Sequence, residues 1–109
     1  MKKEDSIEMF KDTSLLDIFE YLKYNKKIED YWMVHTESSL KTAILLNGPC
    51  LGILGVHSNN KNFWDGEDLL GVKIVLITGW NSEGFIVDGV ILPYTRFNLF
   101  KEIWTRRLP

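Results

Sequence analysis

The chain has 109 residues, a formal net charge of −2 and a pI of about 5.6. At this length it forms a single core, and 45% hydrophobic and 26% charged residues are typical of a globular protein. The acidic pI argues against nucleic acid as a partner, because binding to phosphates requires a concentrated positive surface. The sequence has acidic residues near its start, where a signal peptide would have an apolar core. No apolar run approaches the roughly 20 residues that span a bilayer. We therefore expect a cytoplasmic protein that contacts neither nucleic acid nor membrane.

Residues 5 to 24 carry apolar side chains at three- and four-residue spacing, which is typical of a helix with one buried face. These side chains are Ile7, Phe10, Leu15, Leu16, Phe19 and Leu22. Ser14 is a favourable helix cap, and Asp17 three residues later completes a capping box. The pattern predicts a short helix or turn before residue 13, and a firmer helix from Ser14 to about Lys23.

The next segments alternate between strand-forming and helix-forming sequence. Residues 31 to 35 (YWMVH) are rich in β-favouring side chains and predict a short strand. Residues 36 to 39 offer caps for a helix over residues 40 to 47, which Gly48 followed by proline ends. Residues 50 to 56 (CLGILGV) predict an apolar strand, in which two glycines indicate the close approach of a backbone or an aromatic ring.

Aromatic residues make up 13% of the chain and include four tryptophans, and some of these rings are expected to meet a partner. Residues 57 to 68 form the longest polar segment. Long loops that contain aromatic side chains often bind partners, but an aromatic pair in such a loop can also fold back over the sheet as a satellite of the core. Both alternatives stay open for this loop. We assign partner binding to four aromatic residues, Phe63, Trp64, Trp80 and Trp104.

Residues 69 to 87 (LLGVKIVLITGWNSEGFIV) form the stretch around which the rest of the chain is organised. The run of valines and isoleucines predicts a strand that is buried on both faces. The turn at residues 81 to 84 reverses the chain, so residues 85 to 87 are expected to pair with this strand as a hairpin. Lys73 lies near the start of the strand, where a charged side chain must be paired, snorkelling or functional.

The last part of the chain continues with residues 89 to 94, which predict another strand. Residues 95 to 109 predict a final short helix packed on the sheet, because they place four apolar side chains at helical spacing. These side chains are Phe97, Phe100, Ile103 and Trp104. The order of elements predicts an α+β fold. We expect one domain over residues 1 to 109, with a helical N-terminal segment at 1 to 30 and a β-rich core at 31 to 109.

The order of motifs over residues 38 to 87 resembles a known family. A capped helix runs into Asn-Gly-Pro and an apolar strand, and after a long loop a second apolar strand ends in Gly-Trp-Asn. The matching pieces are SSLKTAILLNGPCLGIL, GVKIVLITGWN and GFIV. In this order they resemble the C-terminal, β-rich half of papain-like cysteine peptidases, and the resemblance covers about two thirds of the chain. It implies a papain-like half-domain, with an antiparallel sheet or partial barrel and short helices at both ends.

The resemblance also implies where the family's catalytic residues would lie, and none of these positions is filled. Counting back from Gly79, the family's histidine corresponds to Lys73, and its asparagine lies near Gly89. The helical half that carries the nucleophilic cysteine is missing or reduced to residues 1 to 30, which contain no cysteine. Thiol catalysis needs a thiolate, an imidazole and a group that orients the imidazole. We therefore expect a pseudo-enzyme.

Cys50 is the only cysteine, and it follows a proline at the start of an apolar strand, a setting that leaves a thiol inert. Seven residues of extended strand would place it roughly 20 Å from His57, so we expect no catalytic dyad. His57 precedes a polar loop that contains Asp65, but the spacing matches no established set of metal ligands. We expect neither a metal ion nor a cofactor.

A papain-like fold without catalysis can still bind, through its loops or through the sheet face that the missing half leaves uncovered. Residues 5 to 24 cover less area than that half, so we expect a homo-oligomer or a complex with a protein partner. The expected role is protein binding or assembly, as in a structural or accessory protein of a phage, in the host cytoplasm or the virion. The alternatives are a cysteine peptidase-like enzyme whose site a partner chain completes, an inhibitor of a host system, and a nucleic-acid-binding inhibitor, which the acidic pI disfavours.

Overall fold

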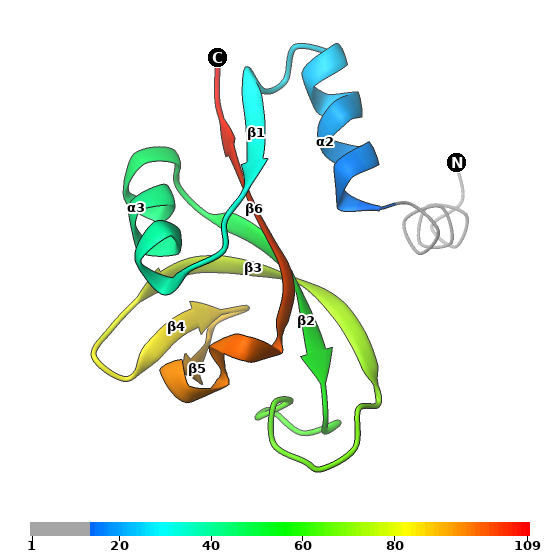
Figure 1. The fold of residues 1–109 in the computed structure, drawn as a ribbon, viewed down its shortest axis with the longest axis vertical. Helices are drawn as coiled ribbons and strands as arrows, with labels where there is room; N and C mark the ends of the chain where they lie inside the picture. Colours follow the sequence, from blue (N-terminus) through cyan, green and yellow to red (C-terminus); the bar gives the residue numbers. More distant parts are fainter. Residues whose placement is uncertain (1–13) are drawn as a thin grey trace. The chain divides into compact units, whose positions relative to one another are not determined.

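Figure 1 shows the computed structural model of the chain, which describes residues 14–109. The chain divides into two units, and each is described by itself. Unit 1 ends at Tyr31 and takes in Arg106–Pro109, whereas unit 2 consists of Trp32–Thr105. The helix or turn predicted before residue 13 lies outside the described residues.

Unit 1 contains the helix α2, Leu15–Tyr24, which starts where the sequence predicts. The Ser14 hydroxyl oxygen accepts a hydrogen bond from the Asp17 N–H at 3.2 Å, and donates to the Asp17 carboxylate at 3.0 Å. This interaction satisfies one of the free N–H groups of the first turn, so the predicted cap is confirmed. Leu15 and Phe19 form the buried face of the helix.

A cluster of charged and polar groups follows α2 in unit 1. The Tyr31 N–H donates to the Asp30 carboxylate at 2.9 Å, and the Lys23 ammonium lies 3.5 Å from the same carboxylate oxygen. Both interactions lower the pKa of Asp30, the backbone hydrogen bond most strongly. Arg107 and Glu29 form a second ion pair at 3.5 Å. Because the paired side chains are about half exposed, these pairs contribute little to stability.

Unit 2 contains the helix α3, Glu37–Asn47. Its cap is Thr36, whose hydroxyl oxygen accepts from the Ser39 N–H at 3.0 Å. The helix therefore begins three residues earlier than predicted. It ends at Gly48 as predicted, because Gly48 adopts a φ of +82° and its N–H donates to the Ile44 carbonyl at 2.9 Å.

A six-stranded antiparallel sheet in the order β1-β6-β2-β3-β4-β5 accounts for most of the remaining chain. Together with the short helices it makes the fold α+β, as predicted. The strands are β1 Asp30–Met33, β2 Cys50–Val56, β3 Gly71–Trp80, β4 Gly84–Val87, β5 Val90–Pro93 and β6 Phe100–Arg107. The predicted hairpin is confirmed, since Trp80 of β3 pairs with Phe85 of β4.

The final helix predicted for residues 95 to 109 is wrong. A 3₁₀ helix, η1 (Tyr94–Leu99), is followed by the strand β6. This strand pairs with β2, with Trp104 opposite Leu51 and Phe100 opposite Leu54. The apolar residues that suggested a helix also suit a strand, and pairing satisfies the backbone groups along one side of β2. The predicted close approach at a β2 glycine is confirmed, because a Cβ on Gly52 would lie 3.0 Å from the Phe100 ring.

The core of unit 2 lies between α3 and one face of the sheet. The helix contributes Leu40 and Ala43, which are almost completely buried. The other buried members of this cluster are Val34, Cys50, Leu54, Phe63, Trp64, Val75, Ile77, Phe85, Val87, Leu92 and Ile103. Figure 1 shows α3 beside the middle strands of the sheet.

The turn between β3 and β4 is fixed by Asn81, whose side-chain oxygen accepts from the Glu83 and Gly84 N–H groups at 2.8 and 3.1 Å. The Tyr94 hydroxyl donates to the Asn81 carbonyl at 2.6 Å, and thereby holds the turn from the side of η1. Immediately after the turn, β4 runs so close to β5 that a Cβ on Gly84 would overlap the Leu92 carbonyl oxygen.

Replacement of Gly84 by alanine is expected to lower the free energy of unfolding by about 2 to 3 kcal/mol, because the Leu92 carbonyl is backbone and cannot move aside. Gly71→Ala is the matched control. Nothing lies within 4 Å of a Cβ at Gly71, so this variant should be neutral or more stable by up to about 1 kcal/mol. Urea denaturation measures both. Equal unfolding midpoints for the two variants would contradict the close packing of β4 on β5.

Candidate functional site

The resemblance sets Lys73 at the histidine position of papain-like peptidases and Gly89 near their asparagine position. The Lys73 ammonium is 3.5 Å from the carboxylate of Asp88, which directly precedes Gly89. It also lies 4.0 Å from the centre of the Phe63 ring, where a cation–π contact stabilises the charge. The Lys73 side chain is therefore paired, one of the three roles that the sequence left open, and it is also 40% exposed.

Cys50 lies at the start of β2 with no exposed surface, and its sulfur is 3.8 Å from the Gly48 carbonyl oxygen. His57 follows the opposite end of β2, so the length of the strand separates the thiol from this imidazole. The other histidine, His35, is exposed between β1 and α3. The described residues thus bring together no pair of nucleophile and base of the kind that thiol catalysis requires.

Three of the four aromatic residues assigned to partner binding are buried. Phe63 and Trp64 are 5% and 7% exposed, and they meet edge to face at 5.1 Å between ring centres. Trp104 is 7% exposed, and its indole N–H donates to the Glu102 carboxylate at 2.8 Å. Trp80 is half-buried. In this conformation a partner could reach part of Trp80 but little of the other three.

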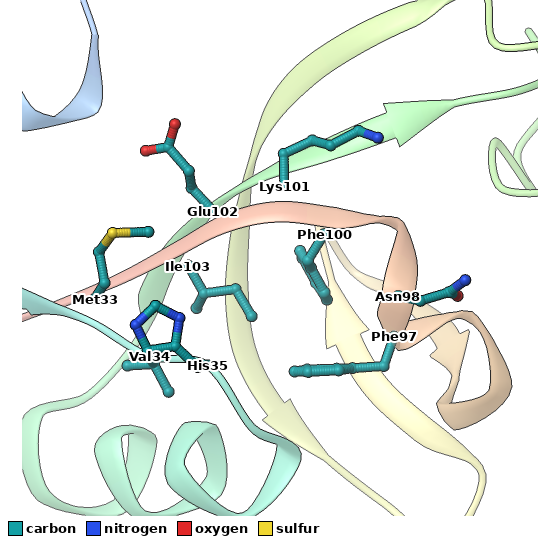
Figure 2. A pocket seen from close by; sticks show the side chains of 9 residues that line it. All are labelled: Met33, Val34, His35, Phe97, Asn98, Phe100, Lys101, Glu102 and Ile103. Carbon is teal, nitrogen blue, oxygen red and sulfur yellow. The ribbon is translucent and has the colours of Figure 1, made fainter.

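A small pocket in unit 2 is lined by Met33 of β1, by the two residues that follow it, and by residues of η1 and β6 (Figure 2). Figure 2 shows apolar side chains at its base, whereas Lys101 points away from them. The Glu102 carboxylate accepts the Trp104 indole N–H and is therefore already engaged. The volume is about 170 Å³, below the roughly 300 Å³ at which ligand sites begin. The pocket has room for one side chain of a partner, but its polar groups do not converge on a point where a reaction would occur.

His57 and the acidic residues of the polar loop after β2 are not gathered into a metal-binding cluster. Among residues 14–109, no three side chains of histidine, cysteine, aspartate or glutamate are grouped so as to hold a metal ion. The Nδ1 atom of His57 is buried without a hydrogen-bond partner.

The face of β3 that points away from the core is apolar and open. Val72, Ile74 and Leu76 are 57%, 44% and 43% exposed, whereas Val75 and Ile77 between and beyond them are buried. We name these three exposed residues the β3 stripe. The prediction that this strand is buried on both faces is therefore wrong: one face packs into the core, and the other carries the β3 stripe.

The sequence could not reveal the β3 stripe because apolar residues occupy both faces of the strand. A half-exposed strand usually alternates apolar and polar side chains, and that alternation is absent from VKIVLI. The only charged residue of this run, Lys73, lies on the same face as the buried Val75. Its charge indicates that this face is exposed, whereas in the structure the opposite face is.

The Cys50 thiol is expected to react with a thiol reagent roughly a hundredfold or more slowly in the folded chain than in urea, because labelling requires an opening that costs several kcal/mol. A time course of labelling followed by mass spectrometry measures this ratio. A thiol-directed peptidase inhibitor should leave the folded chain unmodified for the same reason. Rapid labelling in the absence of denaturant would reveal an accessible, activated thiol and contradict a non-catalytic role.

Comparisons with models of known protein families, with characterised proteins and with solved structures found no match to this chain. Within the part of the chain that the structure describes, no helix is long and apolar enough to cross a membrane. What the chain does must therefore be inferred from its own residues and surfaces.

Proposed function

We propose that the chain is a non-catalytic, papain-like protein that acts by binding protein, as a component of an assembly. The observation that carries this proposal is the β3 stripe. Exposed apolar side chains that are grouped on one strand mark interaction surfaces more often than scattered ones do. The two residues that precede β3, Leu69 and Leu70, are 54% and 57% exposed and extend the apolar surface along the chain.

The size of the β3 stripe indicates what a partner must supply. Full burial of a valine, leucine or isoleucine side chain contributes about 1.5 to 3 kcal/mol, and each residue of the stripe is about half exposed. Covering the three would therefore contribute about 2 to 4 kcal/mol, which is comparable to the lower estimates of the cost of association. The stripe alone does not hold a stable complex, so further contacts beside it are needed.

The absence of catalysis is supported by the surroundings of the family's catalytic positions. Cys50 is buried, and Lys73 is engaged with Asp88 and Phe63 rather than with a thiol. Lys73 lies close to Asp88, beside Gly89, and a papain-like arrangement would likewise bring the histidine and asparagine positions together. This proximity supports a papain-like ancestry for the half-domain, with the chemistry lost.

The binding role is tested by affinity isolation of the tagged chain from its native host. The triple variant Val72→Thr, Ile74→Thr, Leu76→Thr keeps strand-forming side chains but makes the stripe polar. It should lose about tenfold or more of the affinity of the partner that the native chain retains. The control is Leu45→Gln, Leu46→Gln on α3, which removes two side chains that are 75% and 77% exposed on another surface.

The α3 control should retain the partner at the level of the native chain. Equal retention of the partner by the stripe variant would show that the partner binds another surface of the chain. Recovery of no partner by the native chain would contradict the proposed function itself.

A further inference from the structure

The N-terminal half of β3 has a neighbouring strand on only one side. Its pairing with β2 runs from Gly71 to Ile77, whereas its pairing with β4 begins only at Ile77. In Figure 1 this half of β3 lies at the right of unit 2, and no other strand of the unit lies beyond it in that view. Before Leu76, β3 is therefore an open edge within the described sheet, although the strand lies in the middle of the sheet order.

The direction of the backbone groups on this edge follows from Leu76. Its N–H donates to the Asp88 carboxylate at 2.8 Å, and its carbonyl accepts from the Asp88 N–H at 2.9 Å. Both groups of Leu76 thus point away from β2. In an antiparallel pair the direction alternates from one residue to the next, so the N–H and C=O groups of Val72 and Ile74 also point away from β2.

These four groups have no partner strand in the described chain. Two donors and two acceptors therefore remain on an apolar strand edge, which is the feature that natural sheets normally protect with a charge, a proline or a covering segment. Asp88 protects the edge at Leu76 by bonding to its backbone. Nothing comparable engages Val72 or Ile74.

We propose that a second copy of this chain pairs with this edge, so that two β3 strands join antiparallel about a two-fold axis at Lys73. In this register, Val72 of each copy lies opposite Ile74 of the other. The two residues of each such pair exchange N–H···O=C bonds in both directions, so the four open groups of each chain are all satisfied. The inference rests on the proposed assembly role and names its partner.

The charges of two copies balance at the two-fold axis. The two Lys73 side chains would face each other across the axis, and like charges directly opposite are destabilising. Each Lys73 is already 3.5 Å from its own Asp88, however, so two lysines and two aspartates form a neutral group at the centre. A register shifted by one residue would place Val72 and Ile74 opposite residues whose N–H and C=O groups point toward β2. The open groups of Val72 and Ile74 would then stay unpaired.

Pairing in this register also enlarges the apolar surface. Residues that lie opposite one another in an antiparallel pair project to the same face. The β3 stripes of the two copies would therefore merge, with Val72 of one beside Ile74 of the other. The edge hydrogen bonds and the contact between the two stripes together supply the additional binding free energy that one covered stripe does not provide.

Analytical ultracentrifugation of the purified full chain over a concentration series tests the inference. The native chain should show a reversible monomer–dimer equilibrium. The variant Val72→Glu, Ile74→Glu places glutamates opposite each other and should raise the dissociation constant about tenfold or more. The matched variant Val72→Lys, Ile74→Lys should do the same, while an equimolar mixture of the two should dimerise again, because each glutamate then meets a lysine.

Disulfide trapping tests the register and does not depend on the charged variants folding. Residues 73 of the two copies form a non-hydrogen-bonded pair, with Cα atoms about 4.5 Å apart, so Lys73→Cys should crosslink under mild oxidation. Leu76→Cys is the control, because the same register separates the two copies of residue 76 by about 20 Å. The natural Cys50 is buried and should not take part.

A native chain that stays monomeric at every concentration would overturn the inference, as would crosslinking of Leu76→Cys that equals that of Lys73→Cys. Failure of the two charged variants to dimerise when mixed, with native unfolding midpoints, would also count against the pairing. The purified chain contains no other protein. A monomer would therefore remove the second copy as partner, while binding of a different protein is decided by the affinity isolation.

Discussion

Seven consecutive residue pairs join β2 to β3, from Cys50 opposite Ile77 to Val56 opposite Gly71. The rest of unit 2 depends on this ladder. Because β2 and β3 pair with each other, β6 pairs with the other side of β2, and β4 pairs with only the C-terminal end of β3. The inward face of the ladder contributes Leu54, Val75 and Ile77 to the core, which α3 and the loop at residues 57–68 cover. The same ladder determines which β3 groups face outward. Burial of Cys50, exposure of the β3 stripe and the open edge are therefore consequences of one register.

Much of the fold could be predicted from local chemistry. The cap at Ser14, the glycine stop at Gly48 and the turn at Asn81 each need a particular residue at a particular place, and each occurs where the sequence predicts it. Such signals depend on a few neighbouring residues and are little affected by the rest of the chain. The short apolar runs between these signals predict strands for the same reason, because the turn and cap residues on either side limit their length.

The errors arose where distant parts of the chain decide the outcome. Residues 100 to 107 have the spacing of a helix, but the free side of β2 takes them as a strand, which no local pattern shows. The exposure of Val72 and Ile74 depends on what covers the sheet, because both faces of β3 carry apolar side chains. Phe63 and Trp64 illustrate the same limit, since only the fold decides whether an aromatic pair in a loop is buried or offered to a partner. The candidate site was therefore less predictable than the fold around it.

The central claim is that the part of β3 before Leu76 hydrogen-bonds along one side only, and residue-resolved hydrogen exchange by NMR tests it most directly. In dilute solution the amides of Val72 and Ile74 should exchange rapidly, whereas those of Lys73 and Val75, which face β2, should be protected. Raising the concentration should slow exchange at Val72 and Ile74 alone, as the second copy pairs with the edge. Uniform protection of all four amides in dilute solution would show that the edge is already covered within the chain, and would contradict the account.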